Sequence, residues 1–214
     1  SHTYNSQKPQ QSRFLMKQTL FLLTWILVTT IESLHGQGYA SIPWVLRGSF
    51  TGDLKAVSCG SSTTCYAAGD GHWIKSTDGG LTWTEYTSFP INGFPFSCGN
   101  VQNVYAINAD TVIFYTEFNG GSVLRGYRTT DGGQTFASLF DLDKAQRMEF
   151  VNDSVGYACG FVSFGIRKTT DAGATWNNVW TTSNTRLTDL SCPSAQYMYV
   201  CDENGHVWRS SDSG

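Results

Sequence analysis

Short apolar runs separated by turn residues divide most of the chain. Each run is long enough for a strand and too short for a buried helix. Two stretches show four such runs each, at 54–59, 65–69, 72–77 and 82–86, and again at 147–151, 155–160, 166–170 and 175–180. The runs are apolar on one or both faces, as in sheets that other sheets cover. We therefore expect an all-β chain built from small antiparallel sheets.

A short phrase recurs four times along these stretches. It has the form Ser/Thr-x-Asp-x-Gly-x-Thr-aromatic, with aspartates at Asp78, Asp131, Asp171 and Asp212. The aspartates are 53, 40 and 41 residues apart, a spacing expected when each repeat is a four-stranded sheet and neighbouring sheets stack around an axis. The fourth copy stops at Gly214, before its Thr and aromatic positions, which predicts that the chain is a fragment.

The residue types of the phrase suit a tight turn. The aspartate accepts hydrogen bonds from backbone N–H groups just ahead of it, the glycine supplies a positive φ, and the threonine adds a hydroxyl. The closing aromatic ring is expected between sheets, where its burial contributes about 2–3 kcal/mol. Ligand spacing of the EF-hand kind is missing. We therefore predict structural roles for Asp78, Gly80, Thr82, Trp83, Asp131, Gly133, Thr135, Phe136, Asp171, Gly173, Thr175, Trp176, Asp212 and Gly214.

The phrase resembles the Asp-box, or BNR repeat, of sialidases, xyloglucanase-type glycosidases, sortilin and the photosystem II stability/assembly factor family. The stretches 54–59, 153–158 and 165–171 look most like the assembly-factor type. The resemblance covers 42–214 and implies a β-propeller, although function does not follow from fold alone. The four-stranded antiparallel blades are expected at about 53–87, 96–141, 145–182 and 186–214.

The N-terminal part follows another pattern. Met16 and Lys17 precede an apolar run over 20–31, and small residues follow, an order typical of a secretory signal peptide. A membrane helix is the alternative, but about 12 apolar residues are fewer than the ~20 that span a bilayer. We expect a leader outside the fold over 1–15, a signal peptide over 16–38, and a secreted or extracytoplasmic protein with no stable membrane span.

The expected partial propeller, 39–214, begins with a lone outer strand over 42–50, in which Trp44 takes the place that Trp83 has in the first repeat. Such a strand completes the last blade of a propeller and leaves no exposed sheet edge.

Charge and composition exclude one class of partner. The chain has 14 Lys and Arg against 17 Asp and Glu, without a long run of either sign. Nucleic-acid binding is therefore not expected.

Six cysteines fit an exported protein in an oxidising compartment. Cys59 and Cys65 flank a predicted hairpin turn, so they lie opposite each other within disulfide reach. No pair shows the CxxC spacing of a zinc site, and we predict no metal and no cofactor. Pairing stays open, with buried free thiols as the alternative, for Cys98, Cys159, Cys192 and Cys201.

The end of the blades opposite the Asp-box turns is the expected ligand face. Its candidate residues are His72, Phe89, Phe94, Phe96 and His206. The three phenylalanines are either an aromatic platform for a sugar or a protein partner, or part of the core, and the histidines are alternatively turn residues. Arg128, Arg167 and Arg209 recur just ahead of the phrases, which repeat architecture explains. Asn152 opens an N-x-S/T sequon and is a possible N-glycosylation site.

Two function classes remain. A sialidase needs an early Arg-Ile-Pro, and this chain has Ser41-Ile42-Pro43. A xyloglucanase-type enzyme needs two carboxylates facing one cleft, and no motif brings together Glu117, Asp141, Asp143 and Glu149. We expect a secreted, non-catalytic propeller that binds a protein or glycan, without catalytic residues. The alternative is a glycoside hydrolase with its catalytic residues in the missing part of the chain.

Overall fold

The computed structural model describes residues 45–118, 123–181 and 184–214. The chain divides into two units, Ser1–Leu46 and Arg47–Gly214, and all of the strands described below belong to the second. The predicted leader and signal peptide, and Trp44 with them, lie outside the described residues. Residues 45–50 are described and form no strand. Within the described residues, no helix is long and apolar enough to cross a membrane.

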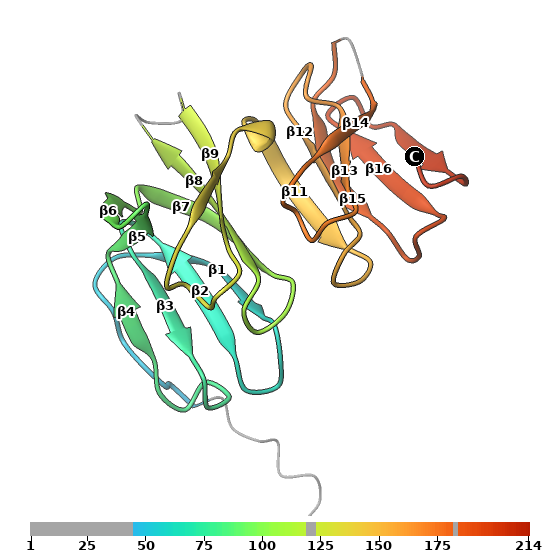
Figure 1. Ribbon diagram of the computed structural model, residues 1–214. Coiled ribbons are helices and arrows are strands. Elements are labelled where there is room, and N and C mark those ends of the chain that lie inside the picture. Colours follow the sequence, from blue (N-terminus) through green and yellow to red (C-terminus); the bar gives the residue numbers. More distant parts are fainter. Residues whose placement is uncertain (1–44, 119–122, 182–183) are drawn as a thin grey trace, which may run out of the picture. The chain divides into compact units, whose positions relative to one another are not determined.

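Three four-stranded antiparallel sheets and one three-stranded sheet follow each other along the chain (Figure 1). Sheet 1 contains β1 (Leu54–Cys59), β2 (Cys65–Gly69), β3 (Trp73–Ser76) and β4 (Thr84–Tyr86). Sheet 2 contains β7 (Asn100–Ala106), β8 (Val112–Phe118), β9 (Val123–Thr129) and β10 (Ala137–Leu139). Sheet 3 contains β11 (Ala145–Phe150), β12 (Gly156–Gly160), β13 (Ile166–Thr169) and β14 (Asn177–Trp180). Sheet 4 contains β15 (Leu187–Ser191), β16 (Met198–Asp202) and β17 (Val207–Ser210).

Two smaller elements connect the sheets. The hairpin of β5 (Ser88–Ile91) and β6 (Phe94–Ser97) links sheet 1 to sheet 2, and a single 3₁₀ turn, η1 (Phe140–Leu142), links sheet 2 to sheet 3. No α-helix occurs in the described residues. The predicted all-β fold class, a propeller of small antiparallel sheets, is confirmed.

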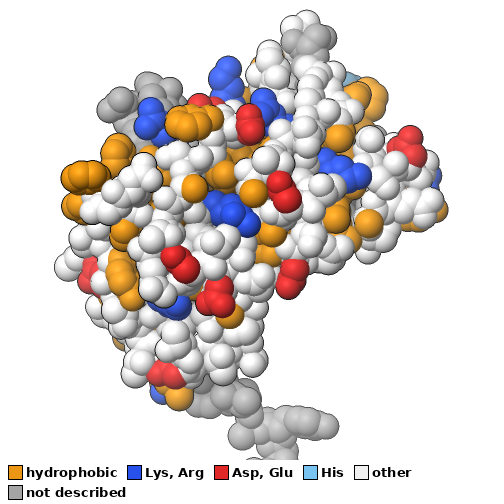
Figure 2. Space-filling view, in the orientation of Figure 1, with side chains coloured by type: hydrophobic (Ala, Val, Ile, Leu, Met, Phe, Trp, Pro, Cys, Tyr) orange, Lys and Arg blue, Asp and Glu red, His pale blue; other side chains and the backbone are white. Residues whose placement is uncertain are grey.

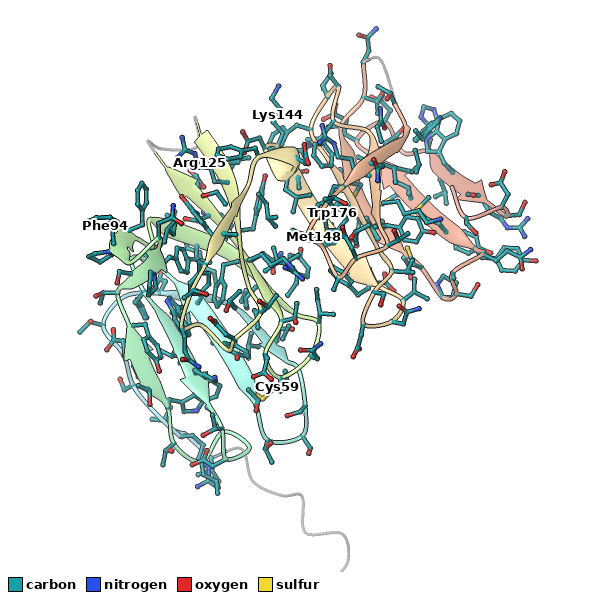
Figure 3. The ribbon with its side chains drawn as sticks, viewed as in Figure 1. Cys59, Phe94, Arg125, Lys144, Met148 and Trp176 are labelled. Atoms are coloured by element: carbon teal, nitrogen blue, oxygen red, sulfur yellow. A yellow bond between two sulfur atoms is a disulfide. The ribbon has the colours of Figure 1, made fainter. Side chains whose placement is uncertain are left out.

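Consecutive sheets pack face to face because side chains alternate along each strand. On β8, Val112 and Phe114 belong to the core between sheets 1 and 2, whereas Ile113 and Tyr115 belong to the core between sheets 2 and 3. The second core also holds Met148 and Trp176, both labelled in Figure 3. A third core lies between sheets 3 and 4 and contains Tyr157, Cys159, Ile166, Leu187, Leu190, Met198 and Val200.

In each of the four sheets, the third strand is followed by a turn, and the four turns share matching hydrogen bonds. We call 76–83, 129–136, 169–176 and 210–214 the aspartate turns. In the second, Thr135 Oγ1 donates to Asp131 Oδ2 over 2.6 Å, and Thr129 Oγ1 donates to Asp131 Oδ1 over 2.8 Å. The first and third turns repeat both bonds, and the fourth repeats the second of them.

Two successive residues in every aspartate turn have positive φ. The second is always a glycine, and the first is Gly79, Gly132, Ala172 or Ser213. Because L-residues other than glycine rarely adopt this conformation, the local hydrogen bonds hold Ala172 and Ser213 against a backbone preference.

The closing aromatic rings of the aspartate turns differ in burial. Phe136 and Trp176 are buried between sheets, as expected. Trp83 is only partly buried, because no sheet covers its side of sheet 1 among the described residues.

A basic residue just before each of the first three aspartate turns links its sheet to the next one. Lys75 Nζ donates to the Gly132 carbonyl over 2.9 Å, and Lys168 Nζ donates to the Ser213 carbonyl over 3.0 Å. Between them, Arg128 Nε donates to the Ala172 carbonyl over 2.8 Å. The sequence pattern had grouped Arg128 with Arg167 and Arg209, whereas the equivalent residue in sheet 3 is Lys168.

Candidate functional site

A groove of about 530 Å³ lies at the end of sheets 2 and 3 opposite the aspartate turns. Most of the walls come from the starts of inner strands β7 and β11 and from the adjacent ends of β8 and β9, because antiparallel order brings these strand ends together. Lys55 of β1 and Phe161, which follows β12, complete them. The described residues that line it are Lys55, Gln102, Asn103, Tyr115, Glu117, Leu124, Ala145, Gln146, Arg147 and Phe161.

The charged side chains of the groove are held by weak, exposed contacts. Lys55 Nζ lies 2.8 Å from Asp70 Oδ1 and also donates to Asn100 Oδ1, and Arg147 Nε lies 3.9 Å from Asp189 Oδ1. Exposed ion pairs of this kind contribute about 0–1 kcal/mol. Both cations can therefore exchange their partners for a ligand at little cost.

The groove also contains paired and unpaired hydrogen-bonding groups. Gln102 Nε2 donates to Glu117 Oε2 over 2.7 Å. The Tyr115 hydroxyl is buried and has no hydrogen-bond partner among the described residues, although the Lys144 backbone lies near it. Burial, with a smaller contribution from Asp143, raises the pKa of Tyr115, so the hydroxyl stays protonated. A buried unpaired hydroxyl costs about 1–3 kcal/mol, which a ligand group could recover.

The predicted ligand-face residues do not line this groove. Phe89 is 0% exposed and its ring centre lies 4.8 Å from that of Phe136 and 5.0 Å from that of Tyr127. The platform interpretation is therefore wrong for Phe89, because the β5–β6 hairpin folds back onto the core, where Phe136 N donates to Pro90 O over 2.8 Å. The core alternative is correct for this residue.

Phe94 and Phe96 are exposed on the same hairpin. Phe94 projects from it in Figure 3, and hydrophobic side chains gather there in Figure 2. Elsewhere in that view acidic and basic side chains are interspersed, in agreement with the even charge pattern of the sequence (Figure 2).

The two candidate histidines hold equivalent positions in sheets 1 and 4, but their surroundings differ. His72 is buried, its Nδ1 lies 2.8 Å from the Asp70 carbonyl, and its Nε2 has no partner among the described residues. His206 is exposed, and its Nδ1 lies 3.0 Å from the buried Asp202 carboxylate. These contacts fit the turn-residue alternative.

The predicted disulfide is present, with Cys59 and Cys65 joined across β1 and β2. The other four cysteines are free, and Cys98, Cys159 and Cys192 are buried. No cluster of three or more His, Cys, Asp or Glu side chains suited to a metal ion occurs in the described part of the chain. Asn152 is exposed in the β11–β12 turn, where its Oδ1 accepts from the Ser154 and Val155 amides.

Of the carboxylates that were weighed for hydrolysis, one lines the groove. Glu117 lines the groove, whereas Asp141, Asp143 and Glu149 are outside its lining. Gln102, Tyr115 and Arg147 were missed by sequence reasoning, because Arg147 joins the two residues of sheet 2 only when sheets 2 and 3 stack.

Comparison with known proteins identifies the fold. No family model and no curated protein matches the chain. Among solved structures, YCF48 bound to D1 peptide matches with a TM-score of 0.55, 16% identity and coverage of 82% of this chain and 58% of that one. YCF48 from Cyanidioschyzon merolae matches with a TM-score of 0.50, 15% identity and coverage of 77% and 52%.

A GH74 xyloglucanase from Xanthomonas campestris also matches, with a TM-score of 0.54, 14% identity and coverage of 76% of this chain and 29% of that one. This chain therefore spans about half of the YCF48 chains and less of the xyloglucanase. At such identities the likeness establishes the propeller fold.

Proposed function

We propose that this chain is a secreted, non-catalytic Asp-box propeller that binds an extended segment of a partner protein in the groove between sheets 2 and 3. The observation that carries the proposal is the groove's mixture of groups. It offers cations at Lys55 and Arg147, an acceptor at Glu117 and the unpaired Tyr115 hydroxyl, beside the apolar Leu124 and Phe161. A peptide backbone presents both donors and acceptors at regular intervals, so one extended segment can form hydrogen bonds with all of these polar groups.

The comparisons support a protein ligand by analogy. One YCF48 structure of similar fold holds a D1 peptide, although identity of 16% carries no residue of that site to this chain. The aspartate turns support the Asp-box assignment, because their hydrogen bonds recur at matching positions in all four sheets. The disulfide supports an oxidising compartment, and with it the predicted export.

A glycoside hydrolase is the second candidate, favoured by the likeness to the GH74 fold. Against it, Glu117 is the one carboxylate among the described residues that line the groove, and most glycosidases need a pair flanking the scissile bond. In addition, Gln102 already donates to Glu117.

Selection of a phage-displayed random peptide library on the immobilised chain tests the proposal. We expect enriched peptides to bind with micromolar affinity, and Arg147→Met to weaken the binding at least tenfold, a factor that corresponds to about 1.4 kcal/mol. Arg209→Met is the matched control, since it removes an exposed guanidinium outside the groove and should leave the affinity unchanged.

Two further assays distinguish the proposal from its two alternatives, a glycan ligand and an enzymatic activity. If a glycan array yields a ligand whose binding depends on Arg147 while no peptide is enriched, the ligand is a glycan and the protein-segment proposal is wrong. If the chain releases reducing ends from xyloglucan and Glu117→Gln abolishes that release, it is an enzyme.

A further inference from the structure

The β11–β12 turn holds an asparagine whose side-chain nitrogen is not used by the fold. Asn152, Asp153 and Ser154 lie in this turn, and all three are exposed. Asn152 Oδ1 accepts from the Ser154 and Val155 amides, each over 2.9 Å. Asn152 Nδ2 and Ser154 Oγ make no hydrogen bond within the described residues. The turn therefore depends on the oxygen of the side-chain amide and leaves its nitrogen free.

The equivalent turn of sheet 2 has the same hydrogen bonds in more crowded surroundings. Asn108 Oδ1 accepts from Asp110 N over 3.1 Å and from Thr111 N over 2.8 Å. Asn108 is only partly exposed, and a Cβ added at Gly60 of sheet 1 would lie 2.0 Å from its carbonyl oxygen. The bonds from side chain to backbone thus belong to the repeat, whereas Asn152 also has space for a large attached group.

The sequence around Asn152 supplies a second requirement for modification. Ser154 follows two positions later, and no other asparagine of the chain has Ser or Thr at that position. This is the sequence at which exported proteins accept N-linked glycans. Two positions after Asn108 the chain has Asp110. Of these two asparagines held in the same kind of turn, only Asn152 therefore has the hydroxyl that glycosylation needs.

We infer that Asn152 carries an N-linked oligosaccharide in the exported protein, and this inference rests on the export that the proposed function includes. The donor is a lipid-linked oligosaccharide diphosphate, used by a transferase of the secretory pathway. Asn152 Nδ2 forms a bond to the first carbon of the donor sugar. The bond between that carbon and the diphosphate oxygen breaks, the lipid diphosphate leaves, and the amide loses one proton to a base of the transferase. Asn152 Oδ1 is unchanged, so both backbone bonds of the turn persist in the product.

The attachment point lies at the end of the sheets away from the groove. Strand β11 begins at the groove, which Arg147 lines, and Asn152 follows the other end of the same strand. Ser154 O also accepts from Ala172 N in the third aspartate turn over 2.9 Å. The oligosaccharide therefore shields the end with the aspartate turns and leaves the groove open to a partner segment.

Expression of the chain from Met16 in insect cells, with the predicted signal peptide in place, tests the inference. We expect peptide:N-glycosidase F to shift the secreted protein to a lower apparent mass. Since this enzyme converts a glycosylated asparagine to aspartate, the tryptic peptide 148–167 should then have aspartate at position 152.

Three variants assign the shift to this turn. Asn152→Gln should abolish it, and so should Ser154→Ala, which keeps both backbone amides that donate to Asn152. Asn177→Gln is the matched control, because Asn177 is an exposed asparagine of sheet 3 outside the sequon, and this variant should keep the shift. A secreted protein without the shift, or a shift that persists in Ser154→Ala, overturns the inference.

The remaining outcomes separate this inference from the proposed function. A chain that stays inside the cells unmodified contradicts the predicted export and the inference with it. Failure of the peptide selection, together with a shift that depends on Asn152, contradicts only the peptide-binding proposal. Removal of the oligosaccharide should leave the affinity for the selected peptides unchanged, and a changed affinity would contradict its placement away from the groove.

Discussion

Each aspartate turn is a small hydrogen-bonded unit whose stability depends on an ionised carboxylate. Partial burial raises the pKa of Asp131, but hydrogen bonds from Thr135 and Thr129 outweigh it and hold that pKa at about 2. The same holds for Asp171, with bonds from Thr175 and Thr169. The turns therefore favour the charged form of both carboxyl groups.

Stability should accordingly fall in acid. These carboxyl groups titrate near 3.8 in the unfolded chain and near 2 in the folded one. Their contribution is therefore complete above pH 3.8 and is lost as the pH falls towards 2. Urea unfolding from pH 7 to pH 2 should show this loss.

Asp131→Ala tests the origin of that pH dependence. It should lower the free energy of unfolding at pH 7 by about 1–3 kcal/mol, since it removes several hydrogen bonds. The variant should also flatten the pH dependence below 3.8, and an unchanged acid profile would contradict the assignment.

Substitution of two glycines distinguishes the cost of backbone strain from the cost of steric crowding. Gly133 has a φ of +97°, and a Cβ there would lie 2.5 Å from the Trp73 ring, whereas Gly93 has a φ of +80° and nothing within 4 Å. Gly133→Ala should cost about 2–4 kcal/mol of unfolding free energy, from strain plus overpacking. Gly93→Ala, the matched control, should cost about 1 kcal/mol from strain. Equal losses in urea unfolding would show that Trp73 moves aside freely.

At the scale of elements, local sequence explains the hairpins. The β5–β6 turn is Asn92-Gly93, both with positive φ, which is the preferred pair for a two-residue turn. The sequence analysis expected no strand over 88–95, although this signal was present. The β1–β2 hairpin is instead fixed by the disulfide between Cys59 and Cys65, which are register partners.

Thiol labelling should separate the exposed cysteine from the buried ones. Burial raises the pKa of Cys98, Cys159 and Cys192 to about 12, so at pH 8 these thiols are both inaccessible and protonated. Cys201 is partly exposed on sheet 4. Titration of the native chain with Ellman's reagent should therefore label Cys201 first, and denaturation without reductant should expose the three others. Rapid labelling of all six would contradict the disulfide.

Loss of the disulfide should have a modest cost. Replacing Cys59 and Cys65 together with serine should lower the unfolding free energy by about 2 kcal/mol, because the closed loop is short. Urea unfolding measures the change, and the same variant treated with reductant is the control, since it should show no further loss.

At the scale of the whole molecule, aromatic rings between sheets carry much of the packing. Trp176 is buried between sheets 2 and 3, whereas Trp83 is half-buried on the face of sheet 1 that no other sheet covers among the described residues. Trp176→Ala should lower the unfolding free energy by about 3–5 kcal/mol. Trp83→Ala should cost clearly less, about 1 kcal/mol, by its smaller buried area. Urea unfolding compares them, and equal losses would mean that Trp83 is buried as deeply as Trp176.

The sequence by itself determined the strands of sheets 1 and 3, the aspartate turns and the Cys59–Cys65 disulfide. Each rests on neighbours within a few residues of each other, so composition and spacing are enough to specify it. The sequence also indicated the propeller class, because a repeated unit with apolar faces must stack on copies of itself.

Only the tertiary structure decided which polar residues meet. Tyr115 and Arg147 share the groove because sheets 2 and 3 stack, and Phe89 is buried because its hairpin folds over the first core. The basic residue before each aspartate turn acquires its role only when the next sheet supplies a carbonyl. These relationships depend on the packing of separate sheets, which a strand pattern does not encode.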